Sequence, residues 1–144
     1  MTIADIYEVL NLHFNRANQA VKEIRQFRLD ENIFDNFETI KTIDTFIYRF
    51  SKIQDYMGEK LFPSVLILLG EYKSSMAFRD TLNKLERLEI IPSVAKWMEF
   101  REIRNTLTHE YPDNEDEIIE GIKLALIVYS EIKDIYDNIK NKYS

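Results

Sequence analysis

The sequence predicts an all-α protein, an antiparallel bundle of four to five helices with a short additional helix. Only 3 glycines and 3 prolines occur in 144 residues, which is too few for the many turns of an all-β fold. Apolar residues recur every three or four positions along most of the chain, the spacing that places one apolar stripe on a helix. The length fits one domain, residues 1–144, which can bury a self-sufficient core.

Two long helices are predicted in the first part of the chain. The first runs from about Ile3 to Phe27 and the second from about Phe34 to Met57, each with an apolar stripe. Between them, the polar stretch carries groups that can begin a helix, namely Asp30, Asn32 and Asp35. Gly58 and Pro63 are then expected to interrupt the second helix.

Three further helical segments are expected after this interruption. The continuous apolar run Val65–Leu69 fits a short helix, because a lone strand would leave its backbone groups unpaired, and Gly70 ends it. Ser74 and Ser75 precede an amphipathic segment over Met76–Glu89. Ser93, after Pro92, is a good N-cap for a helix over Val94 to about Thr108.

The last helix is predicted from the acidic stretch after Pro112 to about Lys140. Asp113 or Asn114 can cap it, and the following acidic residues complement the positive end of its dipole. Because Tyr111 precedes a proline, it should have extended or turn geometry. The stripe of this helix consists of Ile118, Ile122, Ala125, Tyr129, Ile132, Tyr136 and Ile139.

Composition restricts the possible functions. There is no cysteine, so neither a disulfide nor a thiolate metal site can form. The net charge of -6 argues against broad electrostatic binding of nucleic acid, so any RNA contact should be local. The amino terminus lacks the basic residues of a signal peptide and no apolar run reaches the length of a membrane span, so a cytoplasmic location without a membrane partner is expected.

The helix that ends near His109 carries the most informative residues. At about 100° per residue, Arg104 falls within the same arc as the apolar residues Trp97, Phe100 and Leu107. A guanidinium stays charged, so at this position it needs a carboxylate partner, a solvated crevice or an interface that admits an anion. His109 would point about 140° away from Arg104 on a regular helix. Either the last turn distorts, or the two groups meet across a dimer.

Arginine and histidine together suit metal-independent cleavage of RNA. Attack of a ribose 2′-hydroxyl on the adjacent phosphate needs proton transfer, which His109 can perform, and stabilisation of phosphoryl charge, which Arg104 can provide. One histidine does not easily act as both acid and base, whereas a two-fold dimer would supply two. His13 is interpreted as structural, and the sequence contains no metal-binding pattern or glycine-rich phosphate loop, so neither metal nor cofactor is expected.

The stretch Arg104-Asn105-Thr106-Leu107-Thr108-His109-Glu110-Tyr111 resembles the Arg-x4-6-His motif of HEPN domains, and its His-x-Tyr ending resembles the HepT-type toxin branch. The similarity extends to the flanking segments DTLNKLERLEIIPSVAKWMEFREIRNTLTHEYPDN and YRFSKIQDYMGEKLFP. It covers the central and carboxyl-terminal two-thirds of the chain.

The resemblance implies a homodimeric HEPN-like ribonuclease toxin of a two-component toxin-antitoxin system. In such a protein, Arg104 and His109 would be catalytic in a composite cleft, with Asn105 supporting them. The resemblance also implies a cognate minimal nucleotidyltransferase antitoxin that transfers AMP to Tyr111 and thereby silences the toxin. The alternative is a non-catalytic HEPN-type helical module that binds a nucleotide or acts as the partner of a nucleotidyltransferase.

Overall fold

The computed structural model describes residues 1–109 and 115–144, and every regular element in these two ranges is helical. The predicted all-α class is therefore confirmed. In chain order the elements are α1 (Ile3–Ile24), the 3-10 helix η1 (Glu31–Asp35), α2 (Phe37–Tyr56), the π-helical turn η2 (Met57–Leu61), α3 (Phe62–Leu68), α4 (Phe78–Arg87), α5 (Val94–His109) and α6 (Glu115–Lys142).

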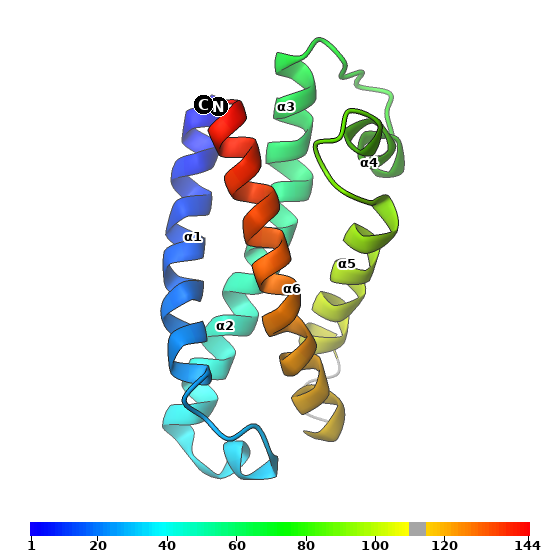
Figure 1. The fold of residues 1–144 in the computed structure, drawn as a ribbon. Coiled ribbons are helices and arrows are strands. Elements are labelled where there is room, and N and C mark those ends of the chain that lie inside the picture. Colours follow the sequence, from blue (N-terminus) through cyan, green and yellow to red (C-terminus); the bar gives the residue numbers. More distant parts are fainter. Residues whose placement is uncertain (110–114) are drawn as a thin grey trace.

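The long helices lie side by side as a bundle (Figure 1). α1 and α2 form an antiparallel pair, α6 runs along the bundle beside α1, and α4 and α5 lie at its side. Both chain ends lie at the same end of the bundle, where the hydroxyl of Tyr7 donates to the backbone carbonyl of Tyr143 at 2.8 Å. Each helix in the described part of the chain is too short or too polar to cross a lipid bilayer.

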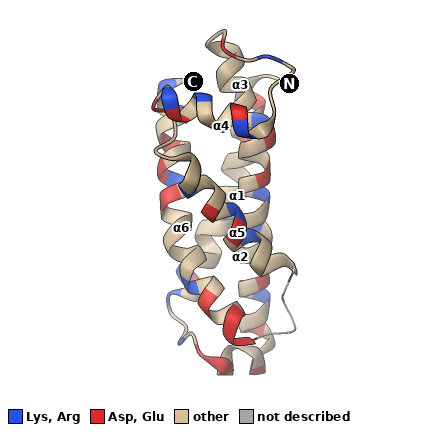
Figure 2. Ribbon diagram, turned by 90° about the vertical axis from the view of Figure 1, so that its right-hand side faces the viewer, with Lys and Arg blue, Asp and Glu red and all other residues tan. Residues whose placement is uncertain are grey.

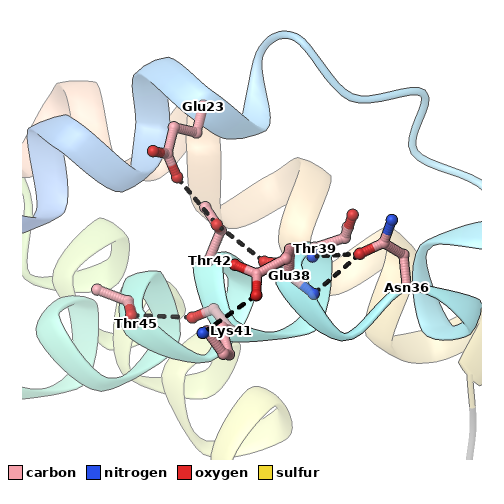
Figure 3. A network of polar contacts seen from close by, with 7 residues as sticks. All are labelled: Glu23, Asn36, Glu38, Thr39, Lys41, Thr42 and Thr45. Carbon is pink, nitrogen blue, oxygen red and sulfur yellow. Dashed lines mark hydrogen bonds and ion pairs between the residues drawn. The ribbon is translucent and has the colours of Figure 1, made fainter.

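α2 begins three residues later than the sequence predicts. The 3-10 helix comes first, with Asp30 as its N-cap, and the extended backbone of Asn36 separates it from α2. The Asn36 side chain then accepts from the backbone N–H of Glu38 and Thr39, which caps α2 (Figure 3). In the same network, Thr42 donates to Glu23 at 2.9 Å and joins α2 to the end of α1.

The predicted interruption at Gly58 and Pro63 is wrong. α2, η2 and α3 follow one another with helical backbone angles at every junction, so they form one continuous rod. Proline lacks an N–H, and its ring clashes with the carbonyl four residues earlier in a regular α-helix. The wider π-helical turn, in which the N–H of Phe62 donates to the carbonyl of Met57, lies where this clash would occur. The helix predicted over Val65–Leu69 is confirmed as the end of this rod.

The ends of the remaining helices follow their caps. Gly70 adopts φ +71° and closes α3, as predicted. α4 begins at Phe78, two residues later than the predicted start at Met76, and the backbone N–H of Ala77 donates to Asp80 there, so neither Ser74 nor Ser75 caps it. Ser93 caps α5 as predicted, because its hydroxyl accepts from the backbone N–H of Lys96 at 3.2 Å. The predicted caps Asp113 and Asn114 lie outside the described residues.

The buried apolar residues form one hydrophobic cluster with members from every long helix. Trp97 on α5 packs edge-on against Phe62 on α3, with 4.7 Å between the ring centroids. Every residue of the stripe predicted for α6 is buried. This core fixes α5 against the rod formed by α2, η2 and α3, and thereby positions Arg104.

Candidate functional site

Arg104 lies on the buried face of α5, as the helical arc predicts. Its neighbours on that face, Trp97, Phe100 and Leu107, are each at most 2% exposed, whereas the Arg104 side chain is 23% exposed. The guanidinium therefore lies at the edge of the core, where its stem packs on apolar atoms and its charge needs a partner.

That partner is Asp55, in the last turn of α2. Arg104 Nη2 donates to Asp55 Oδ2 at 2.8 Å. Of the three environments that the sequence leaves open for Arg104, the structure contains the carboxylate. A charged pair in this half-buried position holds the guanidinium in one orientation.

Two side chains of α5 contact the other end of the guanidinium. Arg104 Nη1 donates to Asn105 Oδ1 and to Thr108 Oγ1, each at 3.3 Å. The Thr108 hydroxyl in turn donates to the Arg104 carbonyl at 3.0 Å. The Arg104 Nε–H is buried and has no partner among the described residues. Asn105, predicted to support Arg104, is thus placed beside it.

His109 is the last residue of α5, and its side chain is exposed. α5 is α-helical through His109, so the distorted last turn that would bring it to Arg104 is not found in the described range. Five residues of a regular helix separate their directions by about 140°. One chain therefore does not bring Arg104 and His109 to one phosphate. Tyr111, the third predicted site residue, lies outside the described residues.

An acidic groove of about 540 Å³ lies between α5 and the start of α6. Its lining contains four carboxylates and no basic residue: Glu102, Ile103, Thr106, Asp116, Glu117, Glu120, Gly121 and Leu124. Figure 2 shows the cluster of acidic residues at the start of α6, and basic and acidic residues interspersed on α5. A nucleic-acid backbone would be repelled by this groove, so it would have to reach Arg104 from another direction.

His13, the other histidine, has a structural contact. Its Nδ1 lies 3.0 Å from Arg49 Nη1, across the α1–α2 pair. A guanidinium can only donate, so Nδ1 accepts and the imidazole is neutral. Partial burial, with the nearby charges of Arg49 and Lys52, lowers the pKa of His13. Among the described residues, no three His, Asp or Glu side chains are placed to hold a metal ion.

Sequence reasoning missed two members of this site, Asp55 and Thr108. A carboxylate partner was one of three environments expected for Arg104, and this expectation does not select one of the chain's 25 acidic residues. The 49-residue separation between Asp55 and Arg104 leaves no local pattern to recognise. No protein-family model, curated protein or solved structure matches this chain.

Proposed function

We propose that this protein is the toxin of a two-component toxin-antitoxin system and acts as a metal-independent endoribonuclease of the HEPN type. The observation that carries the proposal is a half-buried arginine, oriented by Asp55, on the same terminal segment of α5 as the exposed His109. An oriented guanidinium suits a phosphate, and an accessible imidazole suits proton transfer.

The proposed reaction is an internal transfer at phosphorus. The ribose 2′-oxygen forms a bond to the adjacent phosphorus as its proton passes to a base, and the bond from phosphorus to the 5′-oxygen breaks as that oxygen receives a proton. The products are a 2′,3′-cyclic phosphate and a free 5′-hydroxyl. Arg104 stabilises the charge on the phosphoryl oxygens.

A homodimer would supply what one chain lacks. Within one copy, Arg104 and His109 point in different directions and there is one candidate proton-transfer group at the site. Two copies related by a two-fold axis would contribute two imidazoles and two guanidinium groups to a common cleft. The repulsion that the acidic groove between α5 and α6 exerts on RNA favours a cleft on the other side of the helix end.

Tyr111 is the proposed control point. It follows His109 by two residues, so AMP attached to its hydroxyl would add bulk and negative charge close to the catalytic groups. The enzyme that adds it would be a minimal nucleotidyltransferase, which acts as the antitoxin. Incubation with such an enzyme and ATP should add AMP to the wild type and not to Tyr111→Phe, as measured by mass spectrometry.

Purified protein with RNA and an excess of chelator provides the test. Wild type should release fragments with 2′,3′-cyclic phosphate ends, while Arg104→Ala and His109→Ala should lose activity by at least about 100-fold. His13→Asn is the matched control, because it removes the only other histidine and keeps an acceptor for Arg49. Equal RNA integrity with wild type and both site variants would refute the ribonuclease.

The charge balance at Arg104 favours a second candidate, the non-catalytic module. Asp55 already pairs with the guanidinium, and the adjacent groove is acidic. Such a module would bind a nucleotide, or present Tyr111 to a nucleotidyltransferase, without cleaving RNA. Metal-free cleavage that disappears in His109→Ala rules this candidate out.

A further inference from the structure

A cavity of about 230 Å³ opens beside the Arg104–Asp55 pair. It lies between the α2–η2 rod, α4 and α5, and its lining consists of Gln54, Asp55, Gly58, Glu59, Phe78, Trp97 and Arg101. Asp55 belongs both to this cavity and to the pair with Arg104, so a molecule held here lies next to the proposed reaction centre.

Two side chains of the cavity wall carry buried polar atoms without partners in the described part of the chain. Gln54 is 3% exposed, and neither its amide oxygen nor its amide nitrogen has a hydrogen-bond partner among the described residues. Trp97 is 1% exposed, and its indole N–H likewise has none there. Buried polar groups in proteins are normally hydrogen-bonded, so this pair of side chains on the cavity wall points to a ligand.

The backbone around the cavity has an unusual form. η2 is a π-helical turn, a feature that occurs frequently at functional sites. Within it, Gly58 has no side chain to separate the helix from Phe78, since an added Cβ would meet the ring at 3.2 Å. The Arg101 guanidinium lies over the same ring, 4.8 Å from its centroid. The wall thus contains planar groups suited to stacking as well as polar groups suited to recognition.

We propose that this cavity binds a guanine base of the RNA substrate and sets the position of cleavage. The inference rests on the proposed ribonuclease function and names the specificity of the same site. Asp55 and Glu59 supply carboxylate acceptors for the N1–H and N2 amino group of guanine. Trp97 and the Gln54 amide nitrogen supply donors for its O6.

The other bases fit this donor and acceptor set less well. Adenine and cytosine each place an unprotonated ring nitrogen next to the amino group, and this nitrogen would face a carboxylate oxygen that cannot donate. Uracil has one ring N–H flanked by two carbonyl oxygens, and one of these oxygens would again face a carboxylate oxygen that cannot donate. Guanine alone offers two adjacent donors beside an acceptor, so it satisfies the carboxylates and the indole N–H together.

Direct binding tests the cavity separately from catalysis. Trp97 is the only tryptophan in the chain, so its fluorescence reports on the cavity. Titration with GMP, AMP, CMP and UMP should change this fluorescence, with GMP binding on the order of tenfold more tightly than the others. Gln54→Met and the more exposed Glu59→Gln should each remove the preference, while Gln26→Met, on the surface outside the cavity, should keep it. Circular dichroism confirms that each variant is folded.

Mapping of cut sites on a mixed-sequence RNA then separates the possible failures. Cleavage next to guanine in the wild type, scattered in Glu59→Gln, supports the inference. Cleavage without base preference, together with equal binding of the four nucleotides, overturns the guanine cavity and leaves the ribonuclease intact. Selective GMP binding without any cleavage overturns the ribonuclease and leaves the cavity as a nucleotide site.

Discussion

Arg104 Nη2 lies 2.8 Å from Asp55 Oδ2, and this contact joins α5 to the last turn of α2 immediately before the π-helical turn. It therefore ties the candidate catalytic helix to the part of the rod that also forms the proposed guanine cavity. Both proposals depend on this pair, because it orients the guanidinium and places one cavity carboxylate.

The energetic coupling of Asp55 and Arg104 can be measured by a double-mutant cycle. The pair is partly screened by solvent, since its side chains are 40% and 23% exposed. We expect Asp55→Ala and Arg104→Ala to show a coupling of about 1 kcal/mol in the free energy of unfolding, obtained from urea denaturation. Lys96 and Glu131, whose side chains are 52% and 39% exposed, form the control pair and should couple more weakly, because solvent screens them more. Equal coupling in the two pairs would contradict the orienting role of Asp55.

His13 should make the fold less stable in mild acid. Its pKa is lowered from the ordinary value of 6.5 in the folded protein, chiefly by burial and then by Arg49 and Lys52. The unfolded chain therefore binds more protons in this range, so the contribution of neutral His13 is fully present above pH 6.5 and is lost as the pH falls through the lowered pKa. The free energy of unfolding should decrease over this window, and His13→Asn should reduce the decrease. An NMR titration that places the pKa of His13 at or above 6.5 would contradict this account.

The close approach of α5 and α6 depends on Gly121. A Cβ at this position would lie 2.9 Å from Cδ2 of Leu107, which is 1% exposed and packed in the core. Gly121→Ala gains roughly 1 kcal/mol of helix propensity but overpacks the contact by about 1–3 kcal/mol, so we expect a net loss of stability of about 1 kcal/mol.

Leu107→Val provides the control for the Gly121 prediction, because valine lacks the Cδ2 atom. In that background, Gly121→Ala should raise the free energy of unfolding, since the helix propensity remains and the clash is removed. Chemical denaturation of the four proteins gives both values. A loss of equal size in the two backgrounds would show that the Leu107 contact is not the cause.

Periodicity and capping were sufficient to predict most of the fold. The α6 stripe from Ile118 to Ile139 is buried as predicted, because its spacing matches a helix over about six turns and no local feature competes. Ser93 marks the start of α5 because an N-cap acts within one turn and can be read from adjacent residues. Arg104 was placed on the buried face by the same geometry.

The remaining features depend on contacts that sequence spacing does not specify. Gly58 and Pro63 are strong helix breakers in isolation, yet the packing of Phe62 against Trp97 and the π-helical turn keep the rod continuous. Asp55 as the partner of Arg104 follows from the pairing of α2 with α5. Helix geometry predicted that the side chains of His109 and Arg104 point in different directions. That a second copy of the chain brings the two side chains together is a proposal.

We expect the Gln54 side chain to lower the free energy of unfolding of the protein, although it contributes to the proposed binding of guanine. Its buried amide has no partner among the described residues, and burial of an unpaired polar group costs about 1–3 kcal/mol. Gln54→Met keeps the length of the side chain and removes both polar atoms, so we expect the free energy of unfolding to increase by about 1–2 kcal/mol. Gln26→Met, the same change at an exposed position, should stay within about 0.5 kcal/mol of wild type in urea denaturation. A decrease in the stability of Gln54→Met would indicate that the amide is paired within the folded protein, and the described part of the cavity wall would then keep only the Trp97 indole N–H as an unpaired group from which its ligand was inferred.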